Sequence, residues 1–168
     1  MQELEILLKN GRHVEFVDTI LHTKEILYKM GDRKDNDVKI WFKNYIKNKE
    51  ILSLTDQQLV DLSCVLGVYF AKREQKLQLK TTQIRKLLTR FNKIEEDKEN
   101  FNRNDIIKLK PILAYTSARN EPTKDLIKIL DNSINKIRDG KEGYNDFKKI
   151  CDFLRGVVAY HRLAGGSD

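Results

Sequence analysis

Residues 81–94 read TTQIRKLLTRFNKI, and their apolar side chains recur at the spacing of one helix face. Residues three or four apart on an α-helix lie on the same side, so this spacing predicts a helix with a single buried stripe. Thr81 or Thr82 is expected to cap its start. The predicted apolar stripe is Ile84, Leu87, Leu88, Phe91 and Ile94, and a separate polar stripe is Gln83, Lys86, Arg90 and Lys93. This separation is typical of an amphipathic helix packed on a core.

A second helix is expected immediately before this one. Thr55 is followed three residues later by Gln58, which is the spacing of a capping box, and Leu54 and Leu59 flank it as a hydrophobic staple. The predicted helix runs past Phe70. Beyond it Lys72, Lys76 and Lys80 are spaced four apart, so they are expected to form one stripe.

The rest of the chain also has helical periodicity. It predicts helices over residues 14–30, 37–52, 123–138 and 144–163, and a short one that ends at Asn120 before Pro122. Residues 3–8 either start a helix or pack as an arm. No strand-like alternation of useful length is present. We therefore predict an all-α fold, a compact single-domain bundle of about six helices over residues 1–168, with N-terminal helices in residues 1–54 and the other helices in residues 55–168.

Length and composition favour a soluble intracellular protein. A chain of 168 residues can bury one core, and 34% of its residues are charged. No apolar run is long enough for a membrane span, and the acidic N-terminus does not read as a signal peptide. Cys64 and Cys151 are expected to be small, reduced core residues. We expect a cytoplasmic location.

The positive charge is concentrated in residues 72–93. This stretch holds eight bases and one acid, and its net +7 equals the net charge of the whole chain, whose other residues balance at 24 bases and 24 acids. A local, uncompensated positive field is what a polyanion-binding surface needs. Bases spaced seven apart on the last predicted helix, Lys148, Arg155 and Arg162, add a further stripe. The alternative is that these stripes are ordinary solvated faces.

The sequence shows no catalytic constellation. The glycines do not form a phosphate-binding loop, and the three histidines are far apart and pair with neither cysteine at metal-ligand spacing. We expect that the protein is not an enzyme and that it binds no metal, cofactor or small-molecule substrate. His161, at the end of an apolar stripe, is interpreted as a packed helix-end histidine. Phe91, Tyr115 and Tyr160 are expected in the core, so contact with a nucleic acid would be to its backbone, with little reading of bases.

Three segments carry a resemblance to a known family. Residues 81–91 (TTQIRKLLTRF), 109–119 (LKPILAYTSAR) and 147–166 (FKKICDFLRGVVAYHRLAGG) resemble the small subunit of the type III-A CRISPR effector, the Csm complex. The ending VVAYHRLAGG is the most specific of these matches. The three segments also follow one another in the same order as in the family.

The resemblance implies a small, all-helical, non-catalytic subunit of a ribonucleoprotein that acts in antiviral defence. Several copies would stack as an inner filament, contacting the phosphates of the crRNA and target RNA, while other Csm subunits carry the cleavage chemistry. The matched bases are Arg85, Lys86, Arg90, Arg119, His161 and Arg162. Together with the charge pattern, they give the candidate RNA contacts Lys76, Lys80, Arg85, Lys86, Arg90, Lys93, Arg119, His161 and Arg162.

Two other non-catalytic functions stay open at this point. The helix pair around Thr82 could be the helix-turn-helix of a DNA-binding regulator. Alternatively, the chain is a purely structural assembly protein whose bases only face solvent.

Overall fold

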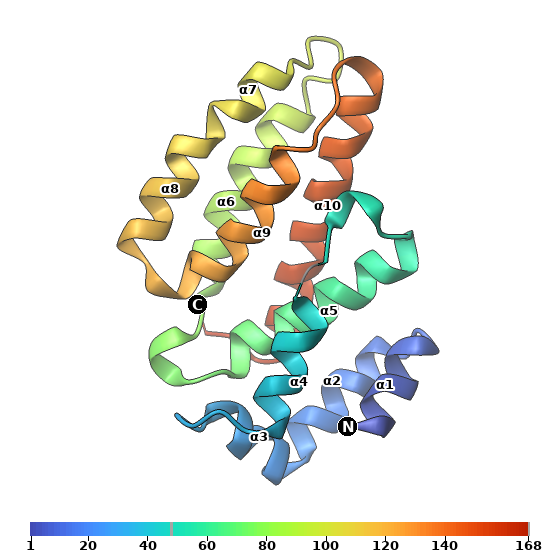
Figure 1. Cartoon of the computed structure of the whole chain (residues 1–168), viewed down its shortest axis with the longest axis vertical. Coiled ribbons are helices and arrows are strands. Elements are labelled where there is room, and N and C mark those ends of the chain that lie inside the picture. The colour runs from blue at the N-terminus through green and yellow to red at the C-terminus, as the bar shows by residue number, and fades with distance from the viewer. Residues whose placement is uncertain (48, 168) are drawn as a thin grey trace.

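The computed structural model describes residues 1–47 and 49–167, and over these residues the regular secondary structure is helical (Figure 1). The all-α prediction is confirmed. The predicted number of about six helices is too low, because the described chain forms α1 to α10 together with three 3-10 turns. Most of the difference in helix number comes from short neighbouring helices that the sequence pattern predicted as one longer helix.

The N-terminal part of the chain illustrates this. It forms α1 (Gln2–Lys9), α2 (His13–His22), α3 (Lys24–Gly31) and α4 (Asp37–Ile46). The helix predicted over residues 14–30 is interrupted at Thr23, whose backbone is extended and whose hydroxyl donates to the carbonyl of Thr19 at 2.7 Å. Threonine hydroxyls compete for backbone groups in this way, so they favour helix ends.

Two long helices form the centre of the molecule, α5 (Asp56–Lys72) and α10 (Gly140–Leu163) (Figure 1). The predicted capping box of α5 is confirmed: the Thr55 hydroxyl accepts from the Gln58 N–H, and the Gln58 side chain accepts from the Thr55 N–H. The two helices approach closely at glycines. A Cβ at Gly67 would lie 2.7 Å from the backbone nitrogen of His161, so only glycine fits there without displacing α10.

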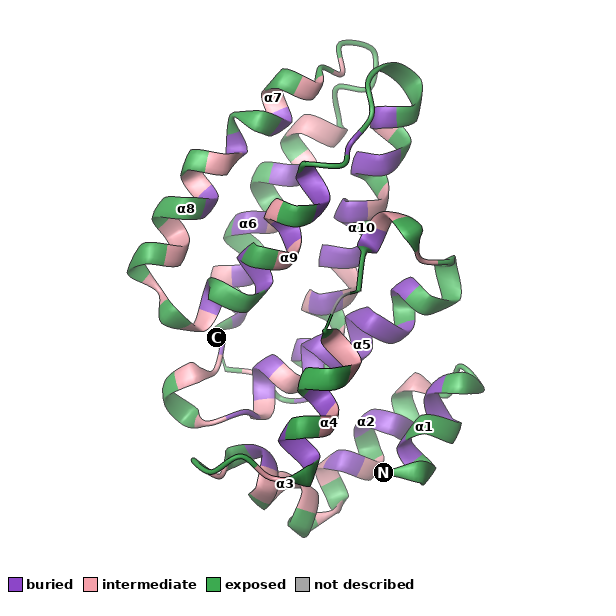
Figure 2. Ribbon diagram, viewed as in Figure 1, coloured by how far each residue is buried: buried purple, intermediate pink, exposed green. Residues whose placement is uncertain are grey.

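The other elements complete the half of the molecule that contains α10. They are α6 (Thr81–Glu95), α7 (Arg103–Ile107), α8 (Leu109–Arg119) and α9 (Lys124–Ile134), with the 3-10 turns η1 (Ile51–Ser53), η2 (Gln75–Leu77) and η3 (Glu121–Thr123). Helix α6 packs along α10, and α8 packs against α9. Figure 2 shows the buried residues concentrated on the inward sides of these helices.

The core has two parts that meet at α5. One joins α5, α6, α8, α9 and α10, and includes Phe70, Phe91 and Phe147. The other packs the N-terminal helices on α5, and includes Phe16 and Phe42. Because α5 contributes to both, residues 1–46 are anchored to the rest of the fold rather than forming a loose arm.

Both cysteines are buried and free, as the sequence predicted. Burial raises the pKa of the Cys64 and Cys151 thiols, since an apolar environment disfavours the thiolate. They are therefore packing residues and poor nucleophiles.

Candidate nucleic-acid interface

The outward face of α6 carries four exposed bases, Arg85, Lys86, Arg90 and Lys93. The opposite side of the helix is buried, with Ile84, Leu87 and Phe91 at most 3% exposed. Since 3.6 residues complete a turn, the four bases occupy the side of α6 that points away from the core. The predicted separation of an apolar stripe from a basic one is confirmed. We call these four residues the α6 basic face.

The α6 basic face is not neutralised by the rest of the fold as far as residues 1–47 and 49–167 describe it. Among the described residues, no carboxylate lies within ion-pair distance of any of its four bases. Other surface bases do have such partners; Lys43, for example, lies 2.7 Å from Asp35. The part of the charge excess that α6 carries therefore remains an uncompensated field among the described residues.

The last helix does not extend this field in the predicted way. Arg155 forms ion pairs with Glu95 and, at 2.8 Å, with Asp152, and it donates a hydrogen bond to Asn92 at 2.9 Å. The hydrogen bond to Glu95 raises the pKa of Arg155 further. The predicted stripe of Lys148, Arg155 and Arg162 is thus interrupted at its middle, where Arg155 instead joins α10 to the end of α6.

His161 lies near the end of α10 and is a structural residue whose ring packs against the beginning of α6. Its side chain is fully buried, with Nε2 2.7 Å from the Leu79 carbonyl oxygen and Nδ1 3.1 Å from the Thr81 hydroxyl. A carbonyl can only accept, so Nε2 donates to Leu79, and in the neutral ring Nδ1 accepts from Thr81. The interpretation as a packed helix-end histidine is confirmed. We remove His161 from the candidate RNA contacts, because burial leaves no ring surface for a phosphate.

Three exposed candidate bases border this end of α6. Lys80 directly precedes the helix, and its N–H donates to the Gln83 side chain at 3.0 Å. Arg162 follows His161 and is exposed at the end of α10. Lys76 lies in the η2 turn. The predicted stripe of Lys72, Lys76 and Lys80 on one helix is wrong, because α5 ends at Lys72.

Helix α5 ends at Lys72 because of the next residue, Arg73. Arg73 belongs to the basic stretch but is only 4% exposed. Its guanidinium donates to the carbonyl oxygens of Leu77 and Pro122 and forms an ion pair with Asp125 at 2.8 Å. Burying an arginine requires such partners, and turning away from the α5 axis brings them within reach. Arg73 therefore fixes η2 against η3 and contributes nothing to the exposed field.

Arg119 lies at the other side of the same end of α6. The Asn120 side chain accepts a hydrogen bond from Gln83 at 3.1 Å, which holds the end of α8 against the first turn of α6. Arg119 is exposed, its guanidinium lies 5.4 Å from the Tyr115 ring centre, and it donates to the Tyr115 hydroxyl. Tyr115 is 60% exposed, so its predicted core position is wrong. Phe91 is buried as predicted, and Tyr160 is partly buried.

The described residues offer neither a metal site nor a membrane span. Among them, no group of three or more His, Cys, Asp or Glu side chains is arranged to hold a metal ion. None of their helices combines the length and the apolar run that a bilayer span requires. The helix-turn-helix alternative lacks its geometry, because residues 73–80 separate α5 from α6 where that motif has a turn of about three or four residues.

Comparison with known protein families gives a match over much of the chain. The family described as Csm2 Type III-A matches residues 54–167, which is more than half of the chain and includes the whole of α6 and α10. No curated protein and no solved structure matches the chain.

Proposed function

Since the chain belongs to the Csm2 family of small subunits of the type III-A CRISPR effector, the Csm complex, we propose that it binds the crRNA and target RNA within that complex. The proposed contacts are the α6 basic face together with Lys76, Lys80, Arg119 and Arg162, which border the start of α6. The subunit would act without catalysis, in the cytoplasm and in antiviral defence. Copies of it would stack into the inner filament beside other Csm subunits.

The observation that carries this proposal is the exposed, unpaired charge on one rigid helix. From Arg85 to Lys93 the helix rises about 12 Å, at about 1.5 Å per residue. That length is enough to face more than one phosphate of a strand whose nucleotides rise by about 3.4 Å each. The packing of α6 on α10 also fixes the backbone that carries the bases, so little backbone freedom is lost when RNA binds.

The chemistry of these side chains favours backbone contact. Lysine and arginine contact phosphate oxygens through charge-assisted hydrogen bonds, which position a strand and carry no sequence information. The Arg119–Tyr115 pair is the exception among the proposed contacts, because an exposed aromatic ring beside a guanidinium can stack on a base. Sequence-independent binding suits a subunit that must accept any guide.

The test compares two charge-matched variants. One is Lys86→Ala/Arg90→Ala/Lys93→Ala on the α6 basic face. The other is Lys9→Ala/Lys24→Ala/Lys141→Ala, which removes three exposed lysines from other elements that have no ion pair with a described residue. Both variants lose three positive charges, so they differ in where on the fold the charges are removed.

Gel-shift titrations with two unrelated single-stranded RNAs measure the result. We expect the α6 variant to bind both RNAs more weakly by about one to two orders of magnitude near 0.1 M salt, because three phosphate contacts are lost. The control variant should stay close to the wild type. Equal affinities for the two variants would reject the α6 basic face as the RNA contact.

A further inference from the structure

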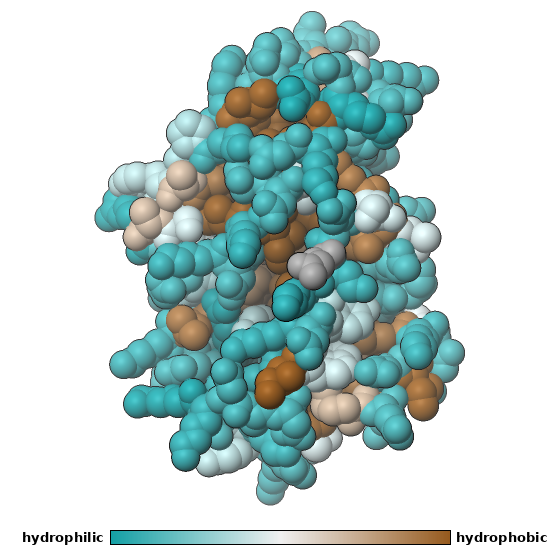
Figure 3. All heavy atoms as spheres, in the orientation of Figure 1, coloured by the Kyte–Doolittle hydropathy of each residue, from teal (hydrophilic) through white to brown (hydrophobic). Residues whose placement is uncertain are grey.

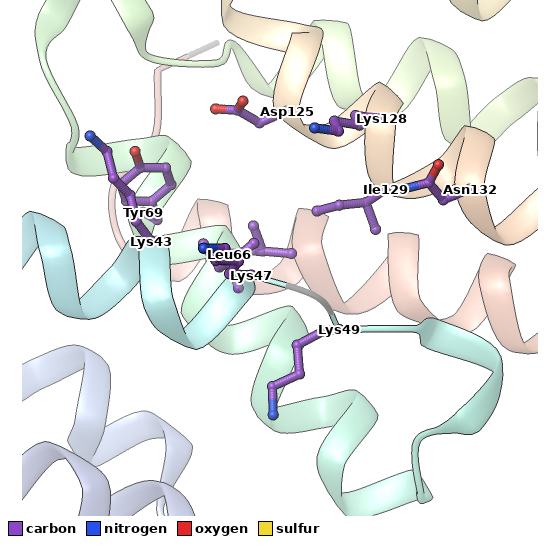
Figure 4. A pocket seen from close by; sticks show the side chains of 10 residues that line it. Lys43, Lys47, Lys49, Leu66, Tyr69, Asp125, Lys128, Ile129 and Asn132 are labelled. Carbon is purple, nitrogen blue, oxygen red and sulfur yellow. The ribbon is translucent and has the colours of Figure 1, made fainter.

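A second positively charged site lies in a cleft between α4 and α9, away from the α6 basic face. It has a volume of about 480 Å³ and is lined by four lysines, Lys43, Lys47, Lys49 and Lys128 (Figure 4). The first three come from α4 and the chain just after it, and the fourth comes from α9. On the face shown in Figure 3 the surface is largely hydrophilic, with hydrophobic atoms visible between the polar side chains near the centre.

The charges of this cleft do not cancel. Asp125, the one carboxylate among the described residues that line it, is already paired with the buried Arg73 at 2.8 Å. Lys43 is paired with Asp35 at 2.7 Å. Lys47 and Lys128 are exposed and have no anionic partner among the described residues. The Lys49 amine lies 5.3 Å from the Tyr45 ring centre, a contact that leaves its charge in place. The cleft therefore has unmatched positive charge at its rim.

The floor of the cleft is apolar, which favours a ligand that has an apolar part beside its anionic group. Ile46, Leu66 and Ile129 line it, next to the side-chain amide of Asn132, which can both donate and accept hydrogen bonds. Pockets that bind small ligands combine an apolar lining with a few polar groups in this way and have volumes of about 300–1,000 Å³. Tyr69 offers little stacking surface, because its ring packs on Phe42 at 5.7 Å and lies 5.4 Å from the Arg73 guanidinium.

We propose that this cleft binds a nucleoside phosphate, whose phosphate groups contact Lys47 and Lys128 while its sugar and base cover the apolar floor. Lysine is a compact point charge suited to phosphate. Asn132 would contact an edge of the base. The nucleotide could be free in solution or one unit of a single strand, since the phosphate chemistry is the same.

This site goes beyond the proposed function. Lys43, Lys47 and Lys49 precede residue 54, so they lie outside the residues that match the family, and none of the α6 bases lines the cleft. The site therefore depends on the packing of this chain's own N-terminal helices against the remainder of the fold. Its test can fail independently of the test of the α6 basic face.

The experiment uses the full chain and four probes: ATP, adenosine as the phosphate-free control, a single-stranded 15-mer of uridine, and poly-glutamate as an acidic peptide. Isothermal titration calorimetry is performed on the wild type and on Lys47→Ala/Lys128→Ala. Two further variants are Lys9→Ala/Lys141→Ala, which is charge-matched, and Lys86→Ala/Arg90→Ala on α6. All substituted residues are exposed, and circular dichroism checks that each variant is folded.

If the cleft takes a free nucleotide, ATP binds the wild type, adenosine does not, and the Lys47→Ala/Lys128→Ala variant binds ATP at least about tenfold more weakly. The charge-matched and α6 variants then keep the wild-type affinity for ATP. If the source is a strand, ATP does not bind, but the cleft variant loses affinity for the 15-mer relative to the charge-matched variant. Either result supports the site.

Two results would overturn it. One is that the cleft variant and the charge-matched variant bind ATP and the 15-mer equally. The other is that only binding of an acidic peptide, tested with a poly-glutamate probe, depends on Lys47 and Lys128, which would make the cleft a protein contact. In the first case, loss of 15-mer binding in the α6 variant alone would still support the proposed function, because ATP binding that does not depend on Lys47 and Lys128 rejects only the cleft.

Discussion

The ring of His161 and the hydroxyl of Thr81 lie 3.1 Å apart inside the core, at the point where α10 meets the first turn of α6. The same ring lies 2.7 Å from the Leu79 carbonyl oxygen, so one side chain satisfies polar groups on both sides of the start of α6. The nearby Thr81 N–H donates to the Ser167 carbonyl at 2.8 Å. These contacts attach the first turn of α6 to α10, and the buried stripe of α6 then leaves its bases facing outward.

Replacing His161 with Ala is expected to destabilise the fold by about 2–4 kcal/mol, because it leaves a cavity and two buried polar groups without their partner. Urea unfolding followed by circular dichroism measures the change. Arg162→Ala is the control, since its side chain is exposed on the next residue. Equal midpoints for the two variants would mean that His161 does not hold α6 in place.

Replacing Gly67 with Ala tests the close approach of α5 to α10. The added methyl group would lie 2.7 Å from the His161 nitrogen and 2.8 Å from the Tyr160 Cβ, so the helices must move apart. We expect a loss of about 1–3 kcal/mol, typical of overpacking. Gly31→Ala is the matched control, because no atom lies within 4 Å of its added methyl group. Thermal unfolding should show a lower midpoint for Gly67→Ala only; similar midpoints would contradict the packing.

The ion pair between Asp146 and Arg138 makes the stability of the fold depend on pH in the acid range. Arg138 donates two side-chain hydrogen bonds to this carboxylate, at 2.9 and 2.7 Å, and these bonds lower the pKa of Asp146 in the folded state. A lowered folded pKa means that Asp146 stabilises the fold above the unfolded pKa of about 4 and that this contribution is lost as pH falls through the folded value.

Asp146→Asn should therefore be less stable than the wild type at pH 7, and the difference should shrink as the pH falls below about 4. Urea unfolding at neutral and acid pH measures both proteins. Asp18→Asn is the control, since Asp18 is exposed and its carboxylate forms no ion pair with another described residue. A stability difference for Asp146→Asn that does not vary with pH would contradict the assignment.

The sequence predicted most reliably where one stretch contains both a start signal and a regular apolar stripe. The capping box at Thr55 and the buried stripe of α6 are examples, because each depends on local spacing alone. The break at Thr23 and the end of α5 at Lys72 were missed. Neither is marked by glycine or proline; the second depends on Arg73, whose partners are far away in the sequence.

For the candidate site, too, the sequence predicted local features but not those that depend on contacts between distant residues. Charge counting identified the basic stretch, but it could not separate Arg73 and Arg155, whose charges are satisfied within the fold, from Lys86 and Arg90, whose charges are not. The cleft between α4 and α9 had no signal in the sequence. Its lysines come from segments about 80 residues apart and meet only through tertiary packing.

The most direct test of the central claim is the salt dependence of RNA binding for the wild type and for Lys86→Ala/Arg90→Ala/Lys93→Ala. For single-stranded RNA, the logarithm of the association constant changes by about 0.7 per phosphate neutralised for each tenfold change in salt. We predict that the slope of the variant is shallower by about 2, for any RNA sequence. Identical slopes for the two proteins would show that these three bases do not contact phosphates, and would contradict the account.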